Sequence, residues 1–298
     1  MCGIVGLFLK NEAMKPQLGE LLSAMLITMT DRGPDSAGIA IYGDETENMI
    51  KLTVQSANPD EDFPALEKSL HSLNGGKPEL MTRDSHAVIR AKESQGDAIR
   101  ALLNTSHPDI RLMSYGQSIE IYKEVGLPQK VVERFDLISA TGSHGIGHTR
   151  MATESAVTTL GAHPFSTGSD QCLVHNGSLS NHNTLRRQLK REGITTQTEN
   201  DSEVAAAYLT ARMNEGHSLG EALTAGIDDL DGFFTFVVGT RNGFGVLRDP
   251  IACKPAVMAE NDDYVAFGSE YRALVGLPGI EQARVWEPEP SQVYFWSH

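Results

Sequence analysis

Cysteine is scarce in this sequence: the 298 residues include three, at positions 2, 172 and 253. An odd number of widely spaced cysteines does not make a disulfide framework. It is typical of proteins in a reducing compartment, so we expect a cytoplasmic protein. Three scattered thiols also cannot supply the four thiolates of an iron–sulfur cluster. We therefore expect neither disulfides nor such a cluster on this chain.

Positive charge and long apolar runs are also lacking. The 25 Lys and Arg residues are outnumbered by 39 Asp and Glu residues, and the net charge of −14 argues against nucleic acid as a partner. The sequence has no apolar run of about 18 residues and no basic stretch leading into an apolar segment. We therefore expect no membrane span and no signal peptide. With 40% hydrophobic residues, the composition indicates an ordinary soluble globular protein.

Strand-like and helix-like patterns alternate along the chain. Apolar runs at 3–9 and 36–42 predict strands, and leucines and methionines at helical spacing predict a helix over 18–29. After a further helix at 219–230, the sequence predicts short strands at 233–239, 244–248, 256–259 and 264–267. Strand blocks and helix blocks joined by hairpins favour an α+β fold over a parallel α/β fold.

Residues 44–140 have a different character. Short strands such as 86–90 and short helices around 99–103 are separated by polar segments, including 57–64, which we predict to be loops. No catalytic pattern stands out in this range. We interpret 44–140 as an elaboration on a single main domain that spans 2–298, and as a candidate interface.

The first residues carry the strongest chemical signal. Removal of Met1, which a small second residue permits, would leave Cys2 with a thiol of pKa ~8.5 beside an α-amine of pKa ~7.7 to 8. An amine that is largely neutral near physiological pH is able to act as a general base for the thiol. The alternative is that Cys2 is a small buried hydrophobic residue at the start of a strand. The hexapeptide alone leaves both interpretations open.

Other polar motifs also have structural explanations. Asn176-Gly177 is what a tight type I′ hairpin requires, and Asn200 with Glu203 fits a capping box. Arg150 could be one half of a buried ion pair. Taken one at a time, these explanations are stronger than the catalytic ones.

Histidine is concentrated in the middle of the chain, at positions 144, 148, 163 and 175. These spacings match no compact ligand pattern, such as two histidines four residues apart on a helix. We therefore predict no metal site.

The order of five motifs is more specific than any one of them. The chain resembles the class II glutamine amidotransferases, which are N-terminal-nucleophile glutaminases, and the resemblance covers most of the chain outside 44–140. The matching motifs are Cys-Gly-Ile at 2–4, Arg-Gly-Pro-Asp-Ser-Ala-Gly at 32–38, His-Thr-Arg-Met-Ala-Thr at 148–153, His-Asn-Gly-Ser-Leu at 175–179 and Asn-Asp-Ser-Glu at 200–203. The resemblance implies the four-layer αββα sandwich of that family, in which strands opening near 3, 145 and 173 bring Cys2, Arg150 and Asn176 to one edge.

The resemblance also implies roles for individual residues. Cys2 would attack the side-chain amide of glutamine to form a thioester, and Asn176 with the backbone N–H of Gly177 would stabilise the oxyanion. Arg150 would bind the substrate α-carboxylate and Asp201 its α-ammonium.

Three further positions are implied to shape the site: Arg32, Thr153 and His163. One residue departs from the family pattern, because many relatives have an aromatic side chain directly after the binding arginine, where this chain has Met151.

The resemblance implies that ammonia is used elsewhere, since no phosphosugar, phosphoribosyl or ATP-binding motif follows Asp201. The later motifs look most like stand-alone amidotransferase subunits related to glutamate synthase, including that of N-methylglutamate synthase (methylamine-glutamate N-methyltransferase). The implied partners are an FMN-binding synthase chain and a Gly-rich β-helix-like chain, with FMN and iron–sulfur cofactors on the partners and none on this chain. Two other functions remain open: a non-catalytic glutamine-binding or regulatory subunit, and an N-terminal-cysteine amidase for another amide.

Overall fold

The apolar run that opens the chain becomes β1, the central strand of the molecule. All seven residues of β1 (Gly3–Leu9) are buried, as expected for a strand covered on both faces. Val5 and Leu7 face the helix α1, whereas Ile4 and Phe8 face a second sheet, because successive side chains of a strand point to opposite faces. One strand thus contributes to two hydrophobic cores.

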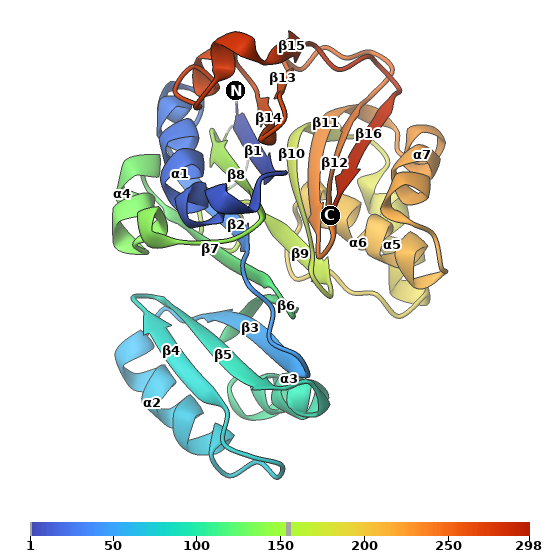
Figure 1. The fold of residues 1–298 in the computed structure, drawn as a ribbon. Coiled ribbons are helices and arrows are strands. Elements are labelled where there is room, and N and C mark those ends of the chain that lie inside the picture. Colours follow the sequence, from blue (N-terminus) through green and yellow to red (C-terminus); the bar gives the residue numbers. More distant parts are fainter. Residues whose placement is uncertain (1, 153–155) are drawn as a thin grey trace.

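The computed structural model describes residues 2–152 and 156–298, and it contains two packed antiparallel sheets (Figure 1). The first has the strand order β15-β13-β14-β1-β8-β2-β7. Its other strands are β2 (Ser36–Tyr42), β7 (Ile119–Val125), β8 (His144–Arg150), β13 (Val257–Glu260), β14 (Tyr264–Gly268) and β15 (Arg284–Trp286). The second has the order β16-β12-β11-β10-β9. Its strands are β9 (Phe165–Gly168), β10 (Gln171–Leu179), β11 (Gly232–Thr240), β12 (Gly243–Arg248) and β16 (Val293–Ser297).

Helices cover the outer face of each sheet (Figure 1). α1 (Leu18–Thr28) and α4 (Pro128–Arg134) pack on the first sheet, and α5 (His182–Arg191), α6 (Asp201–Asn214) and α7 (Leu219–Asp229) pack on the second. The expected α+β fold and its four-layer αββα arrangement are confirmed.

A third, four-stranded sheet has a core of its own. It has the order β4-β5-β3-β6, and α2 and α3 pack on one of its faces. The elements are β3 (Met49–Gln55), α2 (Pro59–Leu70), β4 (Glu79–Arg83), β5 (His86–Lys92), α3 (Gly96–Ser106) and β6 (Arg111–Gly116). The range 44–140 is therefore divided, because β7 and α4 near its end belong to the main sandwich. An ion pair of 3.1 Å between Lys51 and Glu120 joins the third sheet to β7.

The predicted loop at 57–64 is wrong, because α2 begins inside it at Pro59. Proline is well tolerated in the first helical turn, where its missing N–H has no intrahelical partner. Three carboxylates follow in that turn, from Asp60, Glu61 and Asp62. Their negative charges interact favourably with the positive end of the helix dipole and so stabilise the start of the helix. The polar residues that resemble a loop in the sequence are the start signal of a helix.

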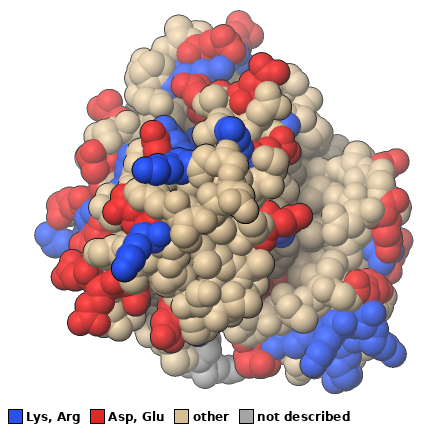
Figure 2. Space-filling model, turned by 90° about the horizontal axis from the view of Figure 1, so that it is seen from below, with Lys and Arg blue, Asp and Glu red and all other residues tan. Residues whose placement is uncertain are grey.

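Charge is unevenly distributed over the surface. Viewed from below, acidic side chains are spread over the left, the top and the right edge of the molecule, and a dense group of Lys and Arg lies at the lower right, on the side where α5 lies in Figure 1 (Figure 2). α5 contains Arg186, Arg187, Lys190 and Arg191 and no acidic residue.

Within residues 2–152 and 156–298, no helix is long and apolar enough to cross a membrane.

Candidate active site

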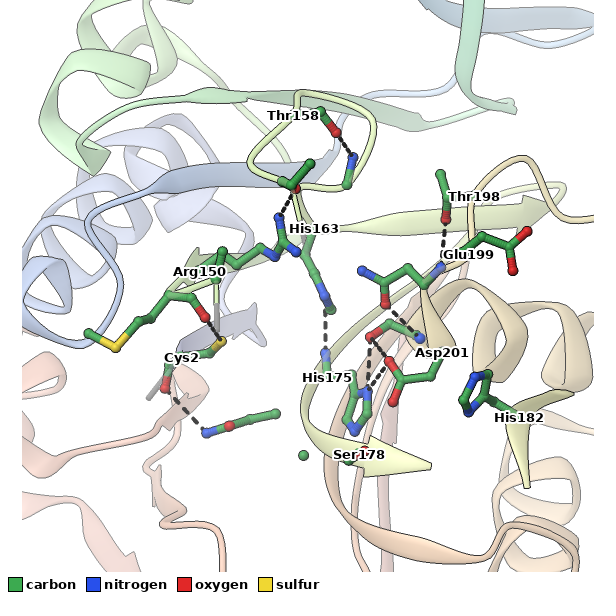
Figure 3. A pocket seen from close by; sticks show the side chains of 18 of the residues that line it. Cys2, Arg150, Thr158, His163, His175, Ser178, His182, Thr198, Glu199 and Asp201 are labelled. Carbon is green, nitrogen blue, oxygen red and sulfur yellow. Dashed lines mark hydrogen bonds and ion pairs between the residues drawn. The ribbon is translucent and has the colours of Figure 1, made fainter. Parts of the chain in front are cut away.

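The ends of three strands meet at one cavity. Gly3 pairs with Thr149, so Cys2, directly before β1, lies beside Arg150 at the end of β8. β10, in the second sheet, contributes Asn176 and Gly177. The cavity between them has a volume of about 580 Å³, and Asp201 lines it as well (Figure 3). The pairing of β1 with β8, together with the packing of the two sheets and of α6 on β10, brings Cys2 and Asp201 to one cavity although they are 199 positions apart.

Cys2 is half-buried and held by its backbone. Its carbonyl oxygen accepts hydrogen bonds from Arg32 Nε at 2.9 Å and from Asn176 Nδ2 at 3.2 Å. Its Sγ lies 3.9 Å from the Met151 carbonyl oxygen. Arg32 is buried, and its Nη1 donates to Glu270 Oε1 at 2.7 Å, which lowers the pKa of Glu270. Arg32 thus fixes the Cys2 carbonyl relative to the segment after β14.

The hairpin explanation for Asn176-Gly177 is wrong. β10 runs without a turn through both residues and pairs with β11, with Asn176 opposite Thr235 and Gly177 opposite Phe234. Gly177 has φ of 149°, and a Cβ there would lie 1.9 Å from the Phe233 carbonyl oxygen. Only glycine fits, because the position has both a positive φ and no space for a side chain. Asn176 itself is buried and directed toward Cys2.

Two oppositely charged side chains line the cavity. Arg150 is 6% exposed, and its Nη1 donates to the Ala156 carbonyl oxygen at 3.2 Å. Asp201 begins α6, and its Oδ2 accepts from the Leu179 N–H at 2.9 Å. A guanidinium and a carboxylate in one cavity match the two charges of a free amino acid.

The cap of α6 differs from the predicted capping box. Asn200 is the N-cap, and its Oδ1 accepts from the Ser202 N–H at 2.9 Å. Glu203 does not return to the Asn200 N–H but accepts from the N–H groups of Gln197 and Thr198, both at 2.6 Å. The cap holds Asp201 at the cavity, while Glu203 anchors the preceding loop.

Three of the four clustered histidines lie beside the site and are neutral. Burial lowers the pKa of His148 to about 3 and the pKa values of His163 and His175 below their usual range. His163 lines the cavity. His144 lies apart, stacked on Tyr42 at 4.1 Å. Thr153 and Met1 lie outside the described residues.

Side chains from other elements hold the segment that follows Arg150. Asp35, in the Arg-Gly-Pro-Asp motif, accepts from the Ala152 N–H at 2.8 Å. The ammonium of Lys123 on β7 donates to the carbonyl oxygens of Ala162 at 2.8 Å and Pro164 at 3.1 Å, and burial lowers its pKa to about 8. These contacts fix the stretch that carries His163.

Several lining residues were not found by sequence reasoning. His182, Thr198, Glu199, Ser202 and Lys254 line the cavity, and Glu270 supports Arg32. Ser202 lies inside the Asn-Asp-Ser-Glu motif at 200–203, so the sequence does contain a signal for it. Lys254 and Glu270 come from the last third of the chain, and only the fold brings them near Cys2.

Known proteins similar to this chain can now be compared with it. A "glutamine amidotransferase-like protein GlxB" of Rhizobium meliloti is 68% identical over 298 residues, covering 100% of this chain and 99% of that protein. A "putative glutamine amidotransferase" of Methanothermobacter thermautotrophicus is 33% identical and covers 99% of both chains. The chain belongs to the glutamine amidotransferase family. A glutamine amidotransferase domain model also matches residues 148–276, which contain Arg150, Asn176, Gly177 and Asp201.

A solved structure supports the fold of this amidotransferase. Its fold is similar to that of the glutamine phosphoribosylpyrophosphate amidotransferase of B. subtilis, with a TM-score of 0.63 at 20% identity. The match covers 99% of this chain and 47% of that one, so the amidotransferase spans about half the length of that enzyme. The predicted family and fold are thereby confirmed.

Proposed function

We propose that this amidotransferase hydrolyses glutamine through a thioester on Cys2. The Cys2 thiol, deprotonated by its own α-amine once Met1 is removed, attacks the side-chain amide carbon. A C–S bond forms, the C–N bond breaks, and the nitrogen leaves as ammonia with the proton taken from the thiol. Water then cleaves the thioester, which releases glutamate and restores the thiol.

One observation carries this proposal: Cys2 lines the same cavity as Arg150 and Asp201. The guanidinium suits the α-carboxylate of glutamine and the carboxylate suits its α-ammonium, so the two ends of the zwitterion would be held while the side chain extends toward the thiol. Asn176 has two amide hydrogens, of which one is donated to the Cys2 carbonyl oxygen, and the other remains for the oxyanion. We propose the Gly177 N–H as the second donor.

We further propose that the ammonia passes to a separate synthase subunit. Ammonia released into water near pH 7 is protonated and loses its nucleophilic lone pair, so a glutaminase without an acceptor site is of little synthetic use. The proposed acceptor is an FMN-binding synthase chain, together with a Gly-rich β-helix-like chain, in a complex similar to glutamate synthase or N-methylglutamate synthase. FMN and any iron–sulfur cluster would be bound by those subunits.

The proposal is tested by the intact mass of the purified chain before and after treatment with a diazoketone analogue of glutamine. We expect loss of Met1 and a single label, mapped to Cys2 and blocked by excess glutamine. Release of glutamate from glutamine by the same preparation completes the test. An unprocessed and unlabelled chain that still binds glutamine would instead identify a non-catalytic binding subunit. Labelling by N-acyl amide analogues alone would identify an amidase for another substrate.

A further inference from the structure

In the part of the chain that the structure describes, the backbone of residue 175, directly before the proposed oxyanion donors, has no paired strand on one side. β9 pairs with β10 at Gln171 and Leu173, and its first residue, Phe165, is opposite Leu173. On its other side β10 continues to pair with β11 through Leu179. The N–H and C=O of His175 therefore need partners other than β9, since an unpaired buried backbone group is costly.

Two imidazoles provide those partners. The His175 N–H donates to Nδ1 of His163 at 3.3 Å, and Nε2 of His148 donates to the His175 carbonyl oxygen at 3.1 Å (Figure 3 shows the first of these). The two rings stack with their centroids 4.0 Å apart and their planes 11° apart. They thus replace one missing residue of a neighbouring strand.

The rings are anchored in different parts of the fold. His148 lies on β8, in the first sheet, two residues before Arg150. His163 lies in the segment before β9, which the Lys123 ammonium holds through the carbonyls of Ala162 and Pro164. The backbone of β10 is therefore held between two elements that themselves line the cavity. A shift of either ring would move residue 175.

The hydrogen bonds also define the tautomers. Nδ1 of His163 accepts a hydrogen bond, so it has no proton, and Nε2 of His148 donates, so it has one. Burial lowers the pKa of His163 most, and the neighbouring His148, His175, Lys123 and Arg150 lower it further, which favours the neutral ring that can accept this hydrogen bond. The electrostatic surroundings therefore favour the protonation states that the two hydrogen bonds require.

Residue 175 determines where the donors of residues 176 and 177 point. In an antiparallel strand, the backbone groups of alternate residues leave the strand on the same side. The N–H of Gly177 accordingly leaves β10 on the side where the imidazoles hold His175, away from β11 and toward the cavity. We propose that His148 and His163 are positioning residues that fix the β10 backbone, so that Asn176 and Gly177 present their N–H groups to the tetrahedral intermediate. This inference rests on the glutaminase function proposed above.

Matched variants separate hydrogen bonding from ring packing. His148→Phe and His163→Phe keep an aromatic ring in each place and remove the hydrogen bond. His148→Gln retains a donor near the Nε2 position, and His163→Asn retains an acceptor near the Nδ1 position. His144→Phe is the control, because His144 is also buried and stacked but lies away from the cavity.

The first readout is glutamine hydrolysis by the processed full-length chain. We expect His148→Phe and His163→Phe to lower kcat by about tenfold to 100-fold, because a misplaced oxyanion donor loses most of its effect. KM should change less than about threefold, since Arg150 and Asp201 are intact. His148→Gln and His163→Asn should restore kcat to within about threefold of the parent chain, and His144→Phe should leave it unchanged.

The second readout does not require turnover. Glutamate γ-semialdehyde would add to Cys2: the Cys2 sulfur bonds to the aldehyde carbon, the C=O becomes C–O, and the thiol proton goes to that oxygen. Formation of this adduct needs the oxyanion donors, whereas glutamate binding needs only the charged side chains of Arg150 and Asp201. We expect the Phe variants to bind the semialdehyde about tenfold to 100-fold more weakly and glutamate with unchanged affinity.

Three results would overturn the inference. Phe variants with the parent kcat would show that the hydrogen bonds are dispensable. Gln and Asn variants as slow as the Phe variants would show that the rings act by packing. Equal losses for glutamate and the semialdehyde would indicate a general loss of structure.

If a Phe variant does not fold, His148→Met and His163→Met replace it under the same criteria. A parent chain without glutaminase activity would instead reject the proposed function itself.

Discussion

The guanidinium of Arg32 connects the carbonyl of Cys2 to the carboxylate of Glu270, two groups from opposite ends of the chain. Arg32→Lys removes the planar fork that makes both contacts, and one ammonium cannot replace it. We expect kcat for glutamine hydrolysis to fall about tenfold, with a smaller effect on KM. Arg272→Lys is the matched control, since Arg272 contacts Glu270 at 2.7 Å but does not contact Cys2 in the described structure. Equal kcat values for the two variants would contradict a positioning role for Arg32.

Asp201 is the residue on which the proposed preference for a free amino acid depends. Asp201→Asn keeps the shape of the side chain and removes its charge. Because a hydrogen bond to a charged group contributes about 1.5–3 kcal/mol, we expect KM to rise about tenfold to 100-fold, with kcat less affected. Steady-state kinetics with glutamine measure this, and Asp228→Asn, an exposed change on α7, is the control. A KM unchanged by Asp201→Asn would remove Asp201 from substrate binding.

At the scale of elements, β10 contains a glycine, Gly177, for which no other residue can be substituted without strain. In Gly177→Ala, the new Cβ would meet the Phe233 carbonyl oxygen at 1.9 Å, so β10 or β11 has to move. We expect loss of glutamine hydrolysis and a Tm several degrees lower, since such strain costs at least ~1–3 kcal/mol. A folded Gly177→Ala enzyme with the parent kcat would exclude the proposed oxyanion donor.

Gly220→Ala offers the opposite comparison. Gly220 lies in α7, and a Cβ there would meet nothing within 4 Å. Alanine is favoured over glycine in a helix by ~0.8–1.0 kcal/mol, so this variant should have a higher Tm and full activity. A lower Tm for Gly220→Ala in the same thermal unfolding series would contradict the expectation that a methyl group at position 220 meets no neighbour.

Sequence patterns predicted helices and strands better than they predicted the residues that hold the site in place. Apolar runs identified β1 and β2 because a strand buried on both faces has few polar residues. The motifs identified Cys2, Arg150, Asn176 and Asp201 as one group, and all four line one cavity. Lys123, Glu270 and the pairing of His148 with His163 could not be predicted, because each acts through a neighbour in space that no local spacing reveals.

The largest difference concerns residues 44–140. The sequence predicts a single insertion over this range, yet β7 and α4 complete the main sandwich, and the third sheet includes only β3 to β6. Hydrophobic alternation identifies a strand but not the sheet that it joins. The buried carboxylate of Asp170, which accepts from the N–H groups of Gln117, Ser118 and Ile119, fixes the point where the chain returns.

At the scale of the whole molecule, buried histidines make the fold sensitive to acid. Burial lowers the pKa of His86, His144 and His148 to about 3, whereas in the unfolded chain the value is ~6.5. Between these values the unfolded chain binds more protons, so stability is lost as the pH falls from about 6.5 toward 3 and is fully present above that range. Each histidine contributes up to ~1.4 kcal/mol per pH unit.

Urea unfolding between pH 7 and pH 5 measures this effect. We expect the unfolding midpoint to fall steeply below pH 6.5. His144→Phe should lower the slope of the unfolding free energy against pH by the equivalent of one proton, whatever its effect at pH 7. An unchanged slope would mean that His144 becomes protonated in the folded protein.

The place where β9 leaves β10 has a meaning beyond catalysis. An open strand edge exposes unpaired N–H and C=O groups and can recruit a strand from another chain, which is why proteins cover or charge such edges. Here the two imidazoles occupy the edge at residue 175, and the next donor along it faces the cavity. The edge that could pair with a strand of another chain is thus occupied at residue 175, and beyond that residue it borders the cavity that also contains Cys2.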